Sequence, residues 1–241
     1  MEAGEAVREH GTMTAEQDTK VSTRDTVDLT RLLGFSDAFF PIIITLLVIE
    51  IHVPEAPPGA LGHALLEAWP SYAAFALAFI YVGIIWLNHH GLFRRVSRTD
   101  TRLNWINLGI LGTSALIPFP TRVLAEALQA GNVADQTSAV VLYGMLAALM
   151  SFAWAPIFPY LERHRERLAP DVPAGYFAAQ RSRPWVGVIC YLTAIATSLL
   201  FSPWAGMSLL LVILFYHAMT SEGLRNVRAD LRMKVGDASP A

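Results

Sequence analysis

Long apolar runs alternate with short polar segments along this chain, and six of the runs are long enough to cross a membrane. A helix needs about 20 apolar residues to span the hydrocarbon core of a bilayer. The predicted spans are Leu32–Val53, Trp69–Asn88, Leu103–Phe119, Ser138–Tyr160, Pro184–Ser202 and Trp204–Thr220. Only a tight turn at Ser202 and Pro203 separates the last two. The pattern predicts an all-α membrane protein with six transmembrane helices per chain.

The basic residues test this topology independently, because Lys and Arg concentrate in the cytoplasmic loops of membrane proteins. The loop from Glu55 to Ala68 contains neither, and the loop after the third span contains Arg122 alone. The rest of the 18 basic residues precede the first span, follow the sixth, or lie in the second and fourth loops. The chain is therefore predicted to be a multi-pass protein of the cell membrane with both termini in the cytoplasm.

The ends of the chain differ from its apolar middle, which divides it into three predicted segments. Residues 1–30 are polar, of mixed charge, and lack the apolar core of a signal peptide. We expect them to form a disordered cytoplasmic arm. Residues 31–222 are expected to form the six-helix transmembrane domain, and residues 223–241 a cytoplasmic tail.

The composition fits a protein that lies mostly in lipid. The chain is 54% hydrophobic and 16% charged, with a mean hydropathy of +0.40, whereas a soluble domain carries about 25% charged residues. It has no Gly-rich phosphate loop, no HExxH motif and no paired metal-ligand spacing. We expect no enzyme, no metal, no cofactor and no nucleic-acid partner. The charged run Glu162–Arg167 favours contact with anionic lipid or solvent over a ligand site.

Polar side chains gather where the first three spans meet the cytoplasm. They are Arg31, Ser36 and Asp37, then Asn88, His89 and His90, and finally Asp100, Asn104 and Asn107. Adjacent helical positions diverge by about 100°, so the two histidines cannot hold one metal ion. An unsatisfied polar group at this depth is costly, so we expect a hydrogen-bonded network. Two interpretations stay open: the network locks the helices together, or it also shapes a pore entrance.

The apolar middle of the first span contains a helical stripe. Ile42, Leu46 and Ile49 share one face of the helix, with Thr45 beside them. Ordinary packing explains most such stripes. If the span faces an axis of symmetry, however, rings of bulky aliphatic side chains form a constriction that gates ions by dewetting. Glu50, near the outer end, is expected either to concentrate cations or to end the helix in solvent.

The start of the first span also carries a family likeness. Arg31-x-x-x-Phe35-Ser36-Asp37, followed by Ile42-x-x-Thr45-Leu46-Leu47, resembles the first-helix signature of the bacterial relatives of the lysosomal potassium channel, transmembrane protein 175. The downstream pattern agrees with it at Trp86-x-x-His89-His90, Asp100, Asn104 to Asn107 and Pro118-Phe119. The likeness covers essentially the whole six-helix chain. Pro41 departs from the family, which usually has a small residue there, and a proline can kink the helix.

The resemblance implies a symmetric homotetramer whose first helices line a central pore. It implies passive, potassium-permeable conduction of monovalent cations without a Thr-Val-Gly-Tyr-Gly filter, a motif that this sequence lacks. It assigns Ile42, Leu46 and Ile49 to the constriction, Thr45 to a pore-adjacent hydroxyl layer, and Arg31, Phe35, Ser36 and Asp37 to a signature network that reaches His89, His90 and Asp100.

Two other functions stay open. One is a proton- or ion-coupled transporter that uses Asp37, His89 and His90 as a relay. The other is a membrane assembly protein without transport activity. The sequence has no midplane charge and no broken-helix repeats, which counts against a carrier.

Overall fold

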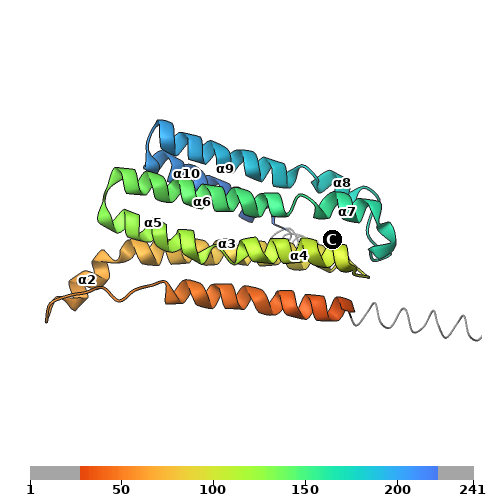
Figure 1. Cartoon of the computed structure of the whole chain (residues 1–241), viewed down its shortest axis with the longest axis horizontal. Helices are drawn as coiled ribbons and strands as arrows, with labels where there is room; N and C mark the ends of the chain where they lie inside the picture. Colours follow the sequence, from red (N-terminus) through yellow and green to blue (C-terminus); the bar gives the residue numbers. More distant parts are fainter. Residues whose placement is uncertain (1–27, 222–241) are drawn as a thin grey trace, which may run out of the picture.

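A computed structural model describes residues 28–221 as an elongated bundle whose long helices run along one axis (Figure 1). The described part of the first helix is Asp28–Ile49. The other helices are α2 (Leu61–Glu67), α3 (Trp69–Phe93), α4 (Thr101–Ser114), α5 (Pro118–Ala130), α6 (Val133–Ala153), α7 (Ile157–Arg163), the 3₁₀ turn η1 (Arg165–Arg167), α8 (Tyr176–Gln180), α9 (Arg183–Leu200) and α10 (Pro203–Thr220). The described residues form no strand, only an isolated bridge between Val96 and Leu168.

Six helical stretches are long and apolar enough to cross a membrane. They are Asp28–Ile49, Trp69–Phe93, Thr101–Ala130, Val133–Arg163, Tyr176–Leu200 and Pro203–Thr220. The prediction of an all-α membrane protein with six spans is confirmed.

The third and fourth spans are longer than predicted because each contains two helices in tandem. A turn at residues 115–117 joins α4 to α5, and Pro118 begins α5 at a position where a helix needs no backbone N–H. The predicted end at Phe119 is therefore wrong, and Arg122 lies inside α5 rather than in a loop. The fourth span begins at Val133, before the predicted Ser138. The Asn132 side chain caps it there by accepting hydrogen bonds from the backbone N–H groups of the second and third helical residues.

Other predicted boundaries also shift. The segment read as a loop before the second span contains α2. The prediction that residues 28–30 belong to a disordered arm is wrong, because these residues are helical. The rest of that arm, residues 1–27, and the predicted tail, residues 223–241, lie outside the described residues. The first helix continues through Pro41, and the side chain of Pro41 is exposed.

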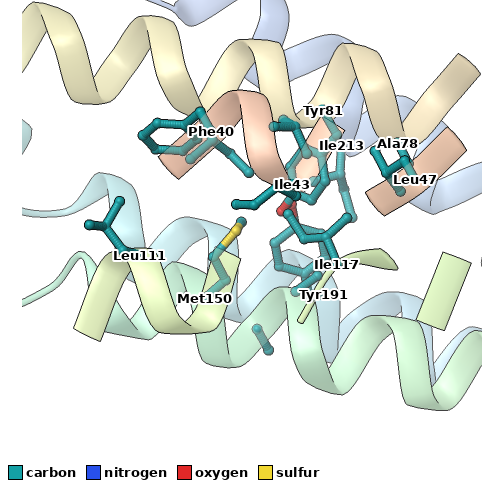
Figure 2. Close-up of a cluster of buried hydrophobic side chains, with 14 of the residues drawn as sticks. Phe40, Ile43, Leu47, Ala78, Tyr81, Leu111, Ile117, Met150, Tyr191 and Ile213 are labelled. Carbon is teal, nitrogen blue, oxygen red and sulfur yellow. The ribbon is translucent and has the colours of Figure 1, made fainter. Parts of the chain in front are cut away.

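One side of the first helix is buried in the main core of the bundle (Figure 2). Phe40, Ile43 and Leu47 are each 1% exposed and recur at helical spacing. They join a cluster that includes Ala78, Tyr81, Val82 and Ile85 of α3, Leu111 of α4, Met150 of α6, Tyr191 of α9 and Ile213 of α10. In a bilayer, lipid tails are as apolar as these side chains, so close packing rather than escape from water holds this contact.

Small residues let the last three long helices approach each other closely. A Cβ atom added to Gly206 of α10 would lie 2.6 Å from Cβ of Ser198 and 3.0 Å from the backbone oxygen of Ala194, both on α9. One added to Gly144 of α6 would meet the side chain of Ile195. The helices α6, α9 and α10 therefore form a packed block (Figure 1), and the first helix lies at the opposite edge of the bundle.

Candidate ion pathway along the first helix

The side of the first helix opposite the core has no protein cover in the single chain. Ile42 is 55% exposed, Leu46 42% and Ile49 71%, although all three are bulky and apolar. Arg31 and Phe35 are also exposed, and at about 100° per residue they fall on the same side of the helix as Ile42. The first helix therefore has a buried side and an uncovered side that carries the whole predicted constriction.

Thr45 adds a hydroxyl group to the uncovered region. Its Oγ1 donates a hydrogen bond to the carbonyl oxygen of Ile42 at 2.8 Å. Because the proton is used within the helix, the lone pairs of this oxygen stay available to a cation. The side chain is exposed and lies between the levels of Ile42 and Ile49.

A buried chain of hydrogen bonds fastens the first helix to α3 and α4. The amide nitrogen of Asn107 donates to Oγ of Ser36 at 2.9 Å, and the amide oxygen of Asn107 accepts from Nε2 of His89 at 2.7 Å. Ser36 in turn donates to the carbonyl oxygen of Leu32 at 2.9 Å. The three linked side chains are at most 1% exposed. One amide thus joins three helices and satisfies each of its partners.

Asp37 belongs to a second, more open group. Its Oδ1 accepts a hydrogen bond from the indole Nε1 of Trp86 at 3.2 Å and lies 3.7 Å from Nδ1 of His90. The side chains of His90 and Asp37 are 45% and 43% exposed. His90, rather than His89, is therefore the histidine beside Asp37. His89 instead packs against the rings of Phe40 and Phe93, at 5.4 and 4.4 Å.

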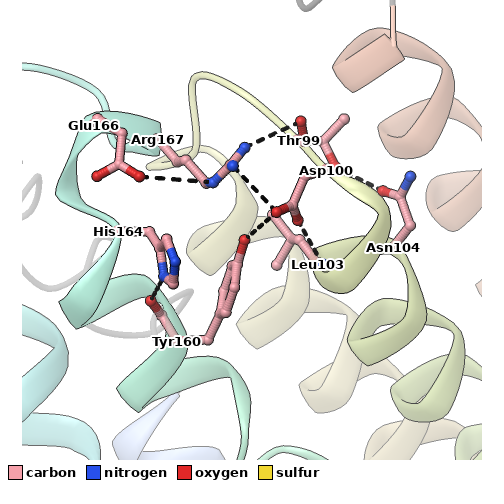
Figure 3. A network of polar contacts seen from close by, with 8 residues as sticks. All are labelled: Thr99, Asp100, Leu103, Asn104, Tyr160, His164, Glu166 and Arg167. Atoms are coloured by element: carbon pink, nitrogen blue, oxygen red, sulfur yellow. Dashed lines mark hydrogen bonds and ion pairs between the residues drawn. The ribbon is translucent and has the colours of Figure 1, made fainter.

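Asp100 lies apart from these residues, in a third cluster at the end of the bundle (Figure 3). It caps α4 by accepting from the backbone N–H of Leu103 at 2.8 Å. The hydroxyl of Tyr160 donates to it at 2.6 Å, and Arg167 forms an ion pair with it at 3.1 Å. Partial burial alone would raise the pKa of Asp100, but these hydrogen bonds and the charge of Arg167 lower it below its ordinary range.

The outer end of the first helix is held by a charge contact. Glu50 lies 3.4 Å from a guanidinium nitrogen of Arg122 on α5, and Arg122 also pairs with Glu126 at 2.8 Å. Arg122 is therefore shared between the carboxylates of Glu50 and Glu126. This contact links the end of the first helix to α5 rather than leaving it free in solvent.

The sequence did not predict the roles of Asn107 and Trp86, whose side chains hold Ser36 and Asp37 of the first helix. Asn107 was one of several polar candidates near the third span, and the Trp86 indole fits the usual place of an interfacial tryptophan. The signal for Asn107 was an amide seven residues into an apolar helix, where it needs partners. Within residues 28–221, no three His, Cys, Asp or Glu side chains lie close enough to hold a metal ion.

Comparisons with known proteins agree with this architecture. Residues 31–118, which include most of the first helix and all of α2, α3 and α4, match the family model described as the endosomal/lysosomal potassium channel TMEM175. A protein of Streptomyces collinus named as a potassium channel is 36% identical over 187 residues, covering 77% of this chain and 90% of that protein. The crystal structure of a lysosomal potassium-selective channel TMEM175 homologue from Chamaesiphon minutus is 31% identical. It superposes with a TM-score of 0.68 and covers 81% of this chain and 99% of that one.

A vertebrate relative is also similar, over a smaller part of its length. The endosomal/lysosomal proton channel TMEM175 of Gallus gallus is 32% identical over 153 residues, covering 58% of this chain and 30% of that protein.

The fold and the matches define a multi-pass membrane protein of an ion-channel class, not an enzyme. The chain belongs to the TMEM175 family.

Proposed function

We propose that this chain is one subunit of a potassium-permeable cation channel in which four copies surround a central pore lined by their first helices. The observation that carries the proposal is the uncovered side of the first helix, where Ile42, Leu46 and Ile49 are exposed while the opposite side is buried. The names of the relatives from Streptomyces collinus and Chamaesiphon minutus support potassium as the permeant ion. In this arrangement K⁺ is the transported ion and no cofactor takes part.

Four copies of the uncovered side would make a narrow apolar passage. Ile42 and Ile49 are separated by two turns, so their rings stand about 10 Å apart along the axis. Leu46 adds a ring between them. Passages of this kind hinder ions because water leaves them readily. The Thr45 hydroxyl would be a polar group within this stretch, close to the path of a partly dehydrated cation.

The polar contacts on the other side would set the rotation of the pore helix. Ser36 is held by Asn107, and Asp37 is held between Trp86 and His90. A helix that turned by one residue would swing Ile42 by about 100° away from the axis. The polar network would then both lock the helices together and shape the pore, because the rotation of the first helix decides which side chains face the axis.

We place the channel in the cell membrane with both termini in the cytoplasm. Arg94, Arg95 and Arg98 follow α3, Arg102 lies in the first turn of α4, and Arg163, Arg165 and Arg167 lie at the end of α7 and in η1. The bridge between Val96 and Leu168 joins these two basic segments, at the end of the bundle where α7 ends (Figure 1). Basic residues at one end mark the cytoplasmic side.

The test is potassium flux through purified protein in liposomes. The wild type should pass K⁺ down its gradient, and Ile42→Asn should raise the flux or lower the K⁺/Na⁺ preference several-fold, because the amide keeps the constriction wet. Ile189→Asn is the matched control, since Ile189 is exposed on α9, and α9 lies at the opposite edge of the bundle from the first helix (Figure 1). Silent liposomes containing a folded tetramer would favour the assembly protein instead, and equal effects of the two variants would exclude the constriction.

Proton permeation is a second candidate, supported by the Asp37 contacts and by the name of the Gallus gallus relative. The same liposomes, loaded with a pH-sensitive dye and supplied with a pH gradient but no K⁺ gradient, measure it directly. Asp37→Asn should then reduce proton flux more than K⁺ flux, whereas a purely potassium-conducting pore would show no proton flux to reduce.

A further inference from the structure

A groove on the outer surface of the bundle joins the start of α4 to the end of α7. It has a volume of about 420 Å³. Its polar lining consists of Arg102, Tyr160, Arg163 and His164, and its apolar walls are formed by Ile106, Pro156 and Pro159. The α4 and α7 helices that line it reach the same end of the bundle (Figure 1), the end that carries the basic segments after α3 and α7. The groove is separate from the uncovered side of the first helix.

The positive charge in this groove is not neutralised by the carboxylates around it. Asp100 is already bound to Tyr160 and Arg167, and Glu162 accepts a hydrogen bond from the backbone N–H of Ala178. Among the described residues, no carboxylate forms an ion pair with Arg102 or Arg163. The groove therefore presents two guanidinium groups without an anionic partner from residues 28–221.

The guanidinium of Arg102 is also oriented by its surroundings. It lies over the ring of Tyr160, 5.7 Å from the ring centre, and that ring stacks on His164 at 4.4 Å. A stacked guanidinium uses its face for the ring and keeps its N–H edge free for paired hydrogen bonds to a phosphate. Figure 3 shows why the Tyr160 ring stays in place, because its hydroxyl is anchored on Asp100.

The depth of the groove matches the headgroup region of a bilayer. Trp105 is exposed one turn along α4 from Arg102, and indoles favour the membrane interface. Ile106 and the two prolines continue the groove with apolar surface towards the membrane. A ligand that fits has an anionic head and an apolar tail.

We propose that this groove binds the headgroup phosphate of an anionic glycerophospholipid from the cytoplasmic leaflet, with Arg102 and Arg163 as its ligands. Basic pockets between transmembrane helices on the cytoplasmic side bind lipid phosphates in this way. The orientation of the leaflet rests on the proposed topology, but the binding itself does not depend on conduction.

The experiment compares thermal melting of the purified, full-length protein in neutral detergent with added phosphatidylglycerol, phosphatidylcholine or inorganic phosphate. Phosphatidylglycerol should raise the Tm of the wild type more than phosphatidylcholine does. R102Q/R163Q should lose most of that rise. R94Q/R181Q is the matched control because it removes the same charge from exposed positions outside the groove, and it should keep the rise. Equal responses of the two double variants would overturn the proposal.

Three further outcomes decide the identity of the ligand. An equal rise with inorganic phosphate would mean that the groove takes a free anion and not a lipid. A change in the size of the R102Q/R163Q assembly before any lipid is added would identify the groove as a contact between subunits. If R102Q/R163Q fails to fold, the single variants R102Q and R163Q replace it. Each removes one guanidinium group from the groove and should lose part of the rise, so an undiminished lipid response in both would also reject the site.

Discussion

Asn107→Ala tests whether one buried amide holds the first helix in place. The substitution removes the hydrogen bond to Ser36 on the first helix and the hydrogen bond from His89 on α3. Asn107 is 0% exposed, so water cannot replace either contact. His89 is left with an unsatisfied N–H among aromatic rings, whereas Ser36 keeps its bond to Leu32.

The size of the effect follows from these contacts. Hydrogen bonds between transmembrane helices contribute about 0.6 kcal/mol each on average. A buried donor without a partner costs about 1–3 kcal/mol more. The sum is about 2–4 kcal/mol, and for a chain of this size each kcal/mol lowers the Tm by about 2–4 °C. We therefore expect Asn107→Ala to lower the Tm by at least about 4 °C.

The assay is thermal melting of the purified protein, followed by K⁺ flux in liposomes. Asn104→Ala is the matched control, because Asn104 lies one turn earlier on α4 and its amide oxygen accepts a hydrogen bond from the hydroxyl of Thr99, which does not belong to the first helix (Figure 3). Ser36→Ala and the double variant complete a cycle that measures the coupling between Ser36 and Asn107, which we expect to be non-additive.

A Tm of Asn107→Ala equal to that of the wild type would refute the role of this amide, and so would equal losses of stability in the Asn104 and Asn107 variants. Additive losses in the cycle would show that the Ser36–Asn107 bond contributes nothing of its own. A decrease in Tm of the predicted size with unchanged flux per folded channel would mean that the amide holds the bundle together without setting the rotation of the pore helix.

Two further predictions concern packing and pH. Gly206→Ala should lower the Tm, since the new methyl group would overlap Ser198 and overpacking typically costs about 1–3 kcal/mol. Gly112→Ala is the control and should not lower the Tm, because no atom lies within 4 Å of its new Cβ. Equal losses of stability in the two variants would contradict the close α9–α10 contact. The pKa of Asp100 is lower in the folded protein than its ordinary value of about 3.9, so its charge stabilises the fold above that pH, and this contribution disappears as the pH falls through the lowered pKa. Asp100→Asn should therefore melt below the wild type at neutral pH and converge with it in acid, and a gap that does not depend on pH would refute the argument.

The boundaries of the spans show what apolar runs can and cannot locate. Hydropathy found all six spans, because each must present about 20 apolar residues to lipid. It ended the third span at Phe119, which lies between Pro118 and Pro120 and shortly before Arg122. In the structure these prolines begin a second helix in the same span, and Glu50 and Glu126 accompany the arginine. Whether a proline ends a span or restarts it depends on the neighbouring helices.

The polar cluster shows a second limit. The sequence indicated that Ser36, Asp37, the two histidines and Asp100 lie at one end of the bundle, because helix direction alternates from span to span. It did not indicate that they divide into three groups. His89 turns inwards to Asn107, His90 turns towards Asp37, and Asp100 caps another helix.

The sequence by itself determined the number of spans, the end of the bundle that carries the basic residues, and the family resemblance that begins in the first helix. These properties depend on local spacing and on the contrast between lipid and water. Only the tertiary structure decided which polar groups meet, which side of the first helix is buried and which basic side chains have no carboxylate partner among residues 28–221. Those properties depend on the rotation and register of each helix against its neighbours, and in apolar spans most residues suit either lipid or a packed core equally well.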